Sequence, residues 1–416
     1  KLGRAWAGLA VASMNMKRLA QAEEYYKTTL ALLDRMSERE KYRTLGTYYS
    51  GFLHNYPQAL EAYRKLVFLF PGDGAGWNNL SIAQVFTLNI PEALAASRHA
   101  LEINPRSLQY RLNFALYSMY AGDFDGAVAE AQKTLTENPS YEFAYLPLAL
   151  STLGKGDIQG AREIYGRFEK ASAYGFSIAK MGEADLEMYL GRYREALEPL
   201  AAGIAADTKE KSTGELALKY VGEAEARLAL GQTAQAVALA TKAAELFKAD
   251  NVLLPAARVL VQAGQEAKAR GIADTLNLML QTQTRSYARL ISGEIALNKK
   301  QIPQAVEALQ EAQKLHNSWL SHFLLGRTYF EGGHAAEALA EFEICRKRRG
   351  ETTDLLFADT STLRYLPPLY YWLARAQEGT GMTKAAHETY REFLKLRTDA
   401  NAGDPLVADA KRRSSS

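Results

Sequence analysis

Hydrophobic residues recur at intervals of three and four through almost the whole chain, which is the spacing of one face of an α-helix. The stretch YREALEPLAAGI, residues 193–204, illustrates the pattern. Such segments come in pairs, and a short turn joins the two members of each pair. The pattern predicts an all-α chain built from helical hairpins.

The hairpins form an internal repeat. Residues 77–105 align without a gap with residues 111–139, at a period of 34. One alanine opens the apolar run of each second helix, and these alanines are Ala22, Ala59, Ala93, Ala127, Ala161, Ala196, Ala236, Ala269, Ala305, Ala338 and Ala386. A hairpin of this size cannot bury its apolar face alone, so the series predicts a solenoid of about eleven stacked helix-turn-helix units.

Glycine and proline mark the helix ends. Gly-Asp or Gly-Gln pairs, such as Gly122–Asp123 and Gly156–Asp157, fill the turn inside a unit, and glycine there can adopt the positive φ that ends a helix. Three prolines break the regular pattern. We expect Pro199 to kink a second helix, and we expect the first helices that contain Pro147 and Pro255 to start late.

The unit resembles the tetratricopeptide repeat. One copy matches the family pattern through Trp77, Leu80, Ala93, Ala100 and Pro105, and another matches it through Leu325, Gly326, Tyr329, Gly333, Ala338 and Phe342. The resemblance extends from about Gly3 to Leu396. It implies a right-handed superhelical solenoid whose first helices line a concave groove, and it implies that the chain binds protein or peptide segments and catalyses no reaction.

The array is expected to have five parts: an N-terminal array of about six units (3–206), a further array of about four (207–347), an inserted loop (348–366), the last unit (367–396) and a C-terminal tail (397–416). The insertion replaces a short turn and carries Leu355, Leu356 and Phe357. Because long loops in compact arrays are usually functional or disordered, and these residues argue against simple disorder, we expect it to cap or narrow the groove.

One position of each first helix is expected to point into the groove. This first-helix row consists of Val11, Tyr48, Ile82, Leu116, Leu150, Asp185, Glu225, Arg258, Glu294, Arg327 and Arg375. Its first five members are apolar or aromatic and its last six are charged, which predicts an apolar half and a charged half. The predicted partner-binding residues are Tyr48, Ile82, Leu112, Leu116, Tyr120, Phe143, Leu146, Leu150, Asp185, Met188, Tyr189, Glu225, Arg258, Glu294, Arg327 and Arg375. The alternative is that individual members pack between repeats.

The stretch LVFLFPGDGAGWNNL, Leu66–Leu80, resembles a nucleotide-binding strand and loop. A dinucleotide fingerprint, however, needs glycine at its sixth place, where Trp77 stands, and a phosphate loop needs a Lys followed by Ser or Thr. The repeat register instead makes Pro71 the end of one unit and Trp77 the start of the next. We therefore expect an inter-repeat turn here.

No residue pattern indicates catalysis, a cofactor or a metal. The six histidines lack metal-binding spacing, and the nearby pair His316 and His322 has no sequence neighbour to complete a site. Cys345, the single cysteine, is expected to be a buried structural thiol. The net charge of +3 is small, and the basic clusters Arg346–Arg349 and Lys411–Ser416 lack interleaved aromatic residues, so we expect them to be solvated rather than bound to nucleic acid.

The expected partner is therefore a protein or peptide segment, with no membrane insertion in this stretch. The segments LDRMSEREKYRTLGTYY and RYLPPLYYWLARAQEGTG resemble the repeat region that follows the catalytic domain of many bacterial serine/threonine kinases, which implies a sensor or docking region of a larger signalling protein. The alternatives are a free-standing scaffold or adaptor and the repeat region of a DNA-binding regulator. One cysteine favours the cytoplasm, and the alternative is a periplasmic or extracytoplasmic location if an upstream membrane span tethers the chain.

Overall fold

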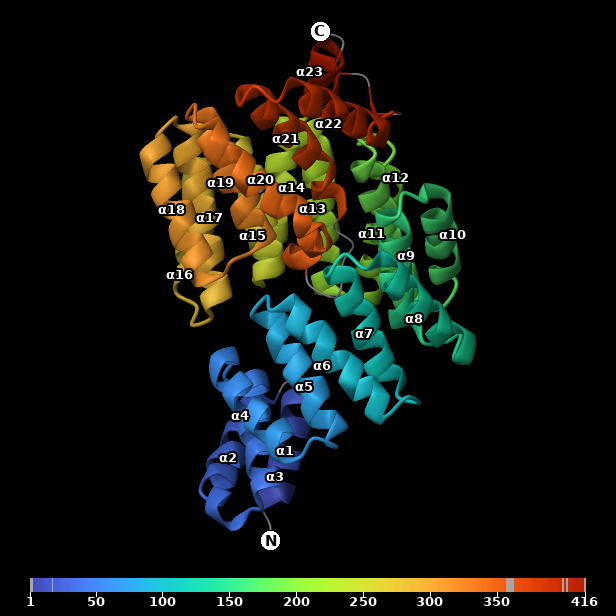
Figure 1. The fold of residues 1–416 in the computed structure, drawn as a ribbon, viewed down its shortest axis with the longest axis vertical. Helices are drawn as coiled ribbons and strands as arrows, with labels where there is room; N and C mark the ends of the chain where they lie inside the picture. The colour runs from blue at the N-terminus through green and yellow to red at the C-terminus, as the bar shows by residue number, and fades with distance from the viewer. Residues whose placement is uncertain (1–2, 17, 357–362, 399, 402, 415–416) are drawn as a thin grey trace. The chain divides into compact units, whose positions relative to one another are not determined.

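The computed structural model describes residues 3–16, 18–356, 363–398, 400–401 and 403–414, with no side-chain account of residues 353–356. Within these ranges the chain is helical and contains no β-strand. Figure 1 shows successive helices folded back on one another as hairpins. By their internal contacts the residues form two compact units, the first made of residues up to 121 with 129–134, and the second of residues 122–128 with 135–416.

The first unit contains three complete hairpins and one further first helix. Its helices are α1 (Gly3–Asn15), α2 (Leu19–Leu30), α3 (Glu38–Thr47), α4 (Tyr56–Leu69), α5 (Gly74–Phe86), α6 (Ile90–Ile103) and α7 (Leu108–Tyr120), and α8 (Phe124–Glu137) has residues in both units. A π-helical turn, η2 (Tyr48–Phe52), extends α3.

The second unit continues the same architecture. Its helices are α9 (Tyr145–Gly154), α10 (Ile158–Phe168), α11 (Ala173–Tyr189), α12 (Leu197–Glu210), α13 (Thr213–Ala229), α14 (Thr233–Leu246), α15 (Asp250–Gln262), α16 (Glu266–Asn277), α17 (Thr282–Asn298), α18 (Ile302–Leu315), α19 (Trp319–Glu331), α20 (Ala335–Lys347), α21 (Pro367–Gly379), α22 (Thr383–Leu396) and α23 (Pro405–Ser414). Odd-numbered helices up to α21 are the first helices of their pairs.

The alanine register predicted from the sequence is confirmed. All eleven alanines are buried, with no more than 1% of any of them exposed. Close approach also selects small residues on the first helices, because a Cβ on Gly46 would lie 2.3 Å from the Tyr63 ring and one on Gly326 would lie 2.7 Å from the Phe342 ring. Small residues at these crossings let the two helices of a hairpin pack at short range.

The Gly-Asp turns form as predicted and do two jobs at once. Gly122 and Gly156 have φ values of +78° and +86°, which end their first helices. The side chain of the next residue then caps the second helix, since Asp157 accepts a hydrogen bond from the Gly160 amide at 2.8 Å. The Gly-Asp dipeptide therefore ends the first helix and begins the second helix of the hairpin.

The glycine-rich stretch after α4 is an inter-repeat turn, as predicted. Asp73 caps α5 by accepting from the Gly76 amide at 2.9 Å, and Arg39 donates to the same carboxylate at 2.8 Å. The Trp77 indole donates to the Pro71 carbonyl at 2.8 Å. One detail differs from the expectation, because Gly74 and Gly76 belong to the first turn of α5.

The expectations for the three irregular prolines are met in one case. α9 does start late, at Tyr145, and Pro147 lies in its first turn. Pro199 produces no kink inside a helix, since α12 begins only at Leu197 and the proline lies in its first turn. The prediction for Pro255 was wrong: α15 starts at Asp250 and contains the proline. The segment 252–254 just before it is fully buried, and this apolar burial favours the longer helix.

The end of the chain returns to an earlier helix pair within the second unit. The Asn401 amide donates to the Gly191 carbonyl at 3.0 Å, and Arg397 donates to the Met188 carbonyl at 3.2 Å. The stretch assigned to a C-terminal tail contains α23, because Leu406, Val407 and Ala410 pack against the aromatic residues of α21 and α22.

Candidate partner-binding surface

In the first unit, the predicted groove residues fall into two classes. Tyr48, Ile82 and Leu116 are half-buried, whereas Leu112 and Tyr120 are buried. Tyr48 packs against the Tyr26 ring, with 5.0 Å between the ring centroids. The half-buried members therefore contribute apolar surface from the first helices of this unit.

Two asparagines connect the first helices of the same unit. The Asn113 amide on α7 donates to Asn78 Oδ1 on α5 at 2.8 Å, and both side chains are buried. Asn113 Oδ1 in turn accepts from Gln109 Nε2 at 3.0 Å, so this asparagine contact belongs to the packing of the first helices.

In the second unit, most of the apolar candidates pack between helices. Leu146, Leu150, Met188 and Tyr189 are buried. Phe143 differs, since 52% of it is exposed and its ring lies 5.8 Å from that of Tyr174. Phe143 is thus the one member of this apolar group that offers open apolar surface.

Of the six charged members of the first-helix row, Asp185, Arg258 and Glu294 are buried, and Glu225, Arg327 and Arg375 are half-buried. Arg258 on α15 donates to Glu294 on α17 at 2.9 Å, and both are nearly inaccessible. Asp185 on α11 is fully buried. A carboxylate in such a position needs a cationic or hydrogen-bonding partner. Within the row, Arg258 is such a partner for Glu294. Asp185 needs a partner from outside the row.

The partner of Asp185 comes from the insertion. A short 3₁₀ turn, η5 (Leu363–Tyr365), carries Arg364 into the row. Its Nη1 donates to Asp185 Oδ1 at 2.7 Å, its Nε donates to Glu225 Oε2 at 2.7 Å, and Tyr365 donates to Glu225 Oε1 at 2.5 Å. The described end of the insertion therefore packs on α11 and α13, as expected, while Phe357 lies outside the described residues. Arg364 cannot be singled out from the sequence, because the insertion carries no repeat signal.

Burial controls the ionisation of this cluster. It raises the pKa of Asp185 to about 7, and the neighbouring Arg364 guanidinium offsets the effect only in part. Burial disfavours the charged form of Arg364, but Glu225, Tyr365 and Asp185 outweigh it and hold its pKa well above the usual value. The arginine is thus the permanent charge of the cluster.

The remaining two arginines of the row stack on aromatic rings. The Arg327 guanidinium lies 5.0 Å from the Trp372 ring centroid, and that of Arg375 lies 5.0 Å from the Phe330 ring centroid. These contacts are of cation–π type and join α19 to α21.

A cavity of about 390 Å³ adjoins the Arg364 cluster. Its walls include Glu225, Arg258, Phe323, Arg327, Tyr365 and Trp372. The predicted row residues Glu225, Arg258 and Arg327 thus come together around one space in the second unit.

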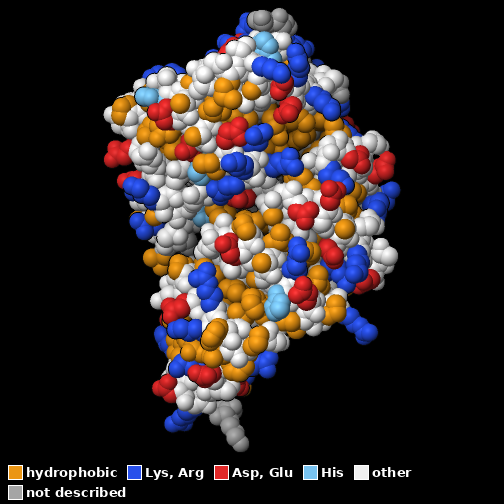
Figure 2. Space-filling model, viewed as in Figure 1, with side chains coloured by type: hydrophobic (Ala, Val, Ile, Leu, Met, Phe, Trp, Pro, Cys, Tyr) orange, Lys and Arg blue, Asp and Glu red, His pale blue; other side chains and the backbone are white. Residues whose placement is uncertain are grey.

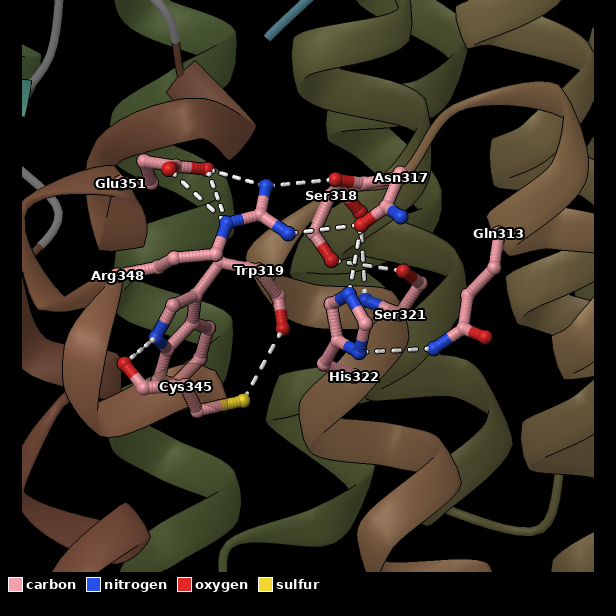
Figure 3. Close-up of polar contacts among 9 residues, drawn as sticks. All are labelled: Gln313, Asn317, Ser318, Trp319, Ser321, His322, Cys345, Arg348 and Glu351. Carbon is pink, nitrogen blue, oxygen red and sulfur yellow. Dashed lines mark hydrogen bonds and ion pairs between the residues drawn. The ribbon is translucent and has the colours of Figure 1, made fainter. Parts of the chain in front are cut away.

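The histidine and cysteine side chains of α19 and α20 have structural contacts. Figure 3 shows His322 hydrogen-bonded to Asn317 and Gln313. Glu341, which lies 19 residues further along the chain, approaches the same ring at 2.5 Å, so the fold gives His322 a carboxylate neighbour that the sequence spacing did not indicate. Cys345 is buried as predicted; burial raises the pKa of its thiol well above the usual value. Among the described residues, no cluster of three or more His, Cys, Asp or Glu is arranged to hold a metal.

The basic cluster Arg346–Arg349 is partly structural. Arg346 and Lys347 are exposed as expected, but Arg348 donates from Nη1 to Asn317 Oδ1 and from Nη2 to the Asn317 carbonyl, both at 2.7 Å (Figure 3). It therefore fastens the turn between α18 and α19. On the face shown in Figure 2, Lys and Arg are interspersed with Asp and Glu. Within the described ranges, no helix has the length and apolarity required to cross a membrane.

Residues 288–350 match the family model described as the tetratricopeptide repeat. No curated protein matches the chain. Among solved structures, a tetratricopeptide repeat protein from Parabacteroides merdae is 17% identical, covers 70% of this chain and 98% of its own, and has a TM-score of 0.40. The APC/C hetero-tetramer Cut9–Hcn1 is 15% identical, covers 97% of this chain and 74% of its own, and has a TM-score of 0.42. YrrB, a tetratricopeptide repeat protein with an unusual peptide-binding site, is 18% identical, covers 39% of this chain and 82% of its own, and has a TM-score of 0.32.

Proposed function

We propose that this chain is a non-catalytic scaffold that binds a segment of a protein partner on the surface of its first helices. One observation carries the proposal. In the second unit, Arg364 and Tyr365 of the chain itself lie against α11 and α13 and hydrogen-bond to two members of the first-helix row. That surface therefore has the chemistry to hold a short peptide segment.

The apolar part of the surface adds anchoring positions in each unit. Leu116 is half-buried in the first unit, and Phe143 is exposed in the second. Apolar anchors that become desolvated usually dominate the affinity of an interface. Phe68 on α4, which is 83% exposed, lies on a second helix and provides a matched comparison.

Capture of a partner by cross-linking tests the proposal. Leu116→Asp and Phe143→Asp should each lower recovery of the partner by roughly fivefold or more, because an aspartate cannot be desolvated in an apolar contact. Phe68→Asp should leave recovery unchanged, and circular dichroism should show equal helicity in all variants. If both variants remain folded and recover the same partner in full, the surface that carries Leu116 and Phe143 is not the binding surface.

The more specific proposal is that the scaffold is the sensor or partner-docking region of a larger signalling protein of the serine/threonine kinase type. It rests on the resemblance of the stretches around Lys41 and Tyr370 to the repeat region of such kinases. The residues encoded before Lys1 test it directly. A kinase catalytic domain there would support it, and a DNA-binding domain would replace it with a regulator of transcription.

A further inference from the structure

The site formed by Asp185 and Glu225 belongs to the repeats, but the group that fills it does not. The two acids occupy the first-helix row on α11 and α13, whereas Arg364 belongs to the insertion between α20 and α21. Arg364 is 179 residues from Asp185 and 139 from Glu225 along the chain. The cluster therefore has the form of a receptor site with a tethered occupant.

The geometry is that of arginine recognition. Arg364 gives Nη1 to one carboxylate and Nε to the other, each at 2.7 Å, so the planar fork of the guanidinium is read from two helices. The side chain is 4% exposed, and that of Asp185 is inaccessible. A lysine has no fork and would meet both acids less well.

The neighbouring tyrosine extends this recognition. Tyr365 donates to the second oxygen of Glu225, and its ring lies 5.5 Å from the Arg258 guanidinium. The same ring forms a wall of the 390 Å³ cavity, which has Phe323 and Trp372 on other walls. The structure thus offers space beside the bound pair for one further side chain.

We infer that Asp185 and Glu225 form a recognition site for an arginine-bearing segment of a protein partner, and that Arg364 is the internal occupant which such a segment displaces. This inference rests on the proposed function and specifies the chemistry of its partner. The preferred segment carries an aromatic residue directly after its arginine, because Tyr365 occupies that place in the internal occupant.

A peptide added in trans tests the inference. The probe is a fluorescent hexapeptide with the sequence of residues 363–368, LRYLPP, and the control peptide LAYLPP lacks the arginine. The full chain with Arg364→Ala should bind the probe at least about tenfold more tightly than the unmodified chain does, because a tethered occupant competes at a millimolar effective concentration. The same variant should bind LAYLPP at least tenfold more weakly, and adding Glu225→Gln should remove probe binding.

A second measurement does not depend on the folding of any variant. In the unmodified chain, millimolar LRYLPP should accelerate amide hydrogen exchange in residues 363–366, and LAYLPP should not. The inference is overturned if the probe neither binds the folded Arg364→Ala chain nor changes this exchange. It is also overturned if the unmodified chain is a dimer that Arg364→Ala converts to a monomer, since the competing occupant is then a second copy. The Leu116 and Phe143 variants test the proposed function independently of either result.

Discussion

At the scale of single residues, the second unit contains buried charges that pair with charges of opposite sign. Lys219 on α13 is 1% exposed, and its ammonium group donates to Asp207 Oδ2 at 2.6 Å and to Ser177 Oγ at 2.8 Å. Burial lowers the pKa of Lys219, and Asp207 opposes the effect. The lysine also fills the space beside Gly203, where an added Cβ would lie 2.4 Å from its Cε.

Lys219→Ala should lower the free energy of unfolding by about 3–5 kcal/mol, because Asp207 would remain buried without a counter-ion. The double variant Lys219→Met with Asp207→Asn removes both charges and should lose less. Urea denaturation followed by circular dichroism compares the two. Equal stability of Lys219→Ala and the unmodified chain would show that the pair contributes nothing.

Asp185 should give the chain a specific pH dependence. Its pKa of about 7 in the folded chain lies above the usual 3.8, so between these values the folded state holds a proton that the unfolded state has released. The contribution of Asp185 to the free energy of unfolding should therefore fall as pH rises from about 4 to 7, by at most about 1.4 kcal/mol per pH unit, and stay level above that.

The stability difference between the unmodified chain and Asp185→Asn, measured in urea at pH 5, 6, 7 and 8, isolates this contribution. The free energy of unfolding of the unmodified chain should fall relative to that of the variant as pH rises to 7. A difference that instead grows with pH would mean that Arg364 outweighs burial and holds the pKa of Asp185 low.

The charged positions of the first-helix row follow from the repeat register, but their surroundings do not. The charges at Asp185, Glu225 and Arg258 could be predicted from one repeat position, since the register is periodic. The burial of Asp185 could not, because the neutralising Arg364 comes from a segment with no period. Charges at a groove-facing position suggest an open surface, but here the Arg364 segment of the same chain covers part of it.

At the scale of elements, the register was predictable because it is set by close packing. Ala338 on α20 is fully buried, and Ala336 on the same helix is exposed. Ala338→Leu should overpack the hairpin and lower the free energy of unfolding by about 1–3 kcal/mol, whereas Ala336→Leu should change it little. Ala127→Leu should behave like Ala338→Leu. Thermal melting of the three variants checks this, and equal midpoints would contradict the assigned packing.

The turns inside the hairpins allow a stabilising change. Lys300 ends the turn after α17 with φ of +59°, where most other units have glycine. Lys300→Gly should raise the free energy of unfolding by about 1 kcal/mol, because a side chain in the left-handed region is strained. Lys299 has φ of −85°, so Lys299→Gly should lower it. Urea denaturation of the two variants measures both changes in the free energy of unfolding. A loss of stability in Lys300→Gly would mean that the ion pair between Lys300 and Glu331 outweighs the backbone strain.

Helix starts were less predictable than the register. Proline was expected to delay α15, but the helix begins five residues before Pro255. A proline costs one hydrogen bond and some steric strain, while the buried residues Val252 and Leu254 favour helix at the same place. Which effect prevails depends on what the preceding helices cover, and a single sequence does not contain that information.

At the scale of the whole molecule, the repeat rule of neighbour-only contacts fails inside the second unit. Arg397 and Asn401 contact the turn between α11 and α12, more than 200 residues earlier in the chain. The first helices of the same unit are also tied by Arg364 to the insertion. In an ideal solenoid each repeat meets only its neighbours, and stability is a sum of local terms. Long-range contacts of this kind couple the last hairpin to an early one.

This coupling has a measurable consequence at one amide. The Arg194 amide donates to Asn401 Oδ1 at 2.9 Å, and Asn401 Nδ2 donates to Glu195 at 2.8 Å. Asn401→Ala removes both side-chain bonds and leaves the backbone bond to Gly191. Hydrogen exchange at Arg194 should then accelerate roughly fivefold, equivalent to about 1 kcal/mol for a lost hydrogen bond. Amides in the middle of α17 should keep their rates and serve as the internal control. An unchanged rate at Arg194 would show that the two ends of the unit open independently, as neighbour-only contacts require.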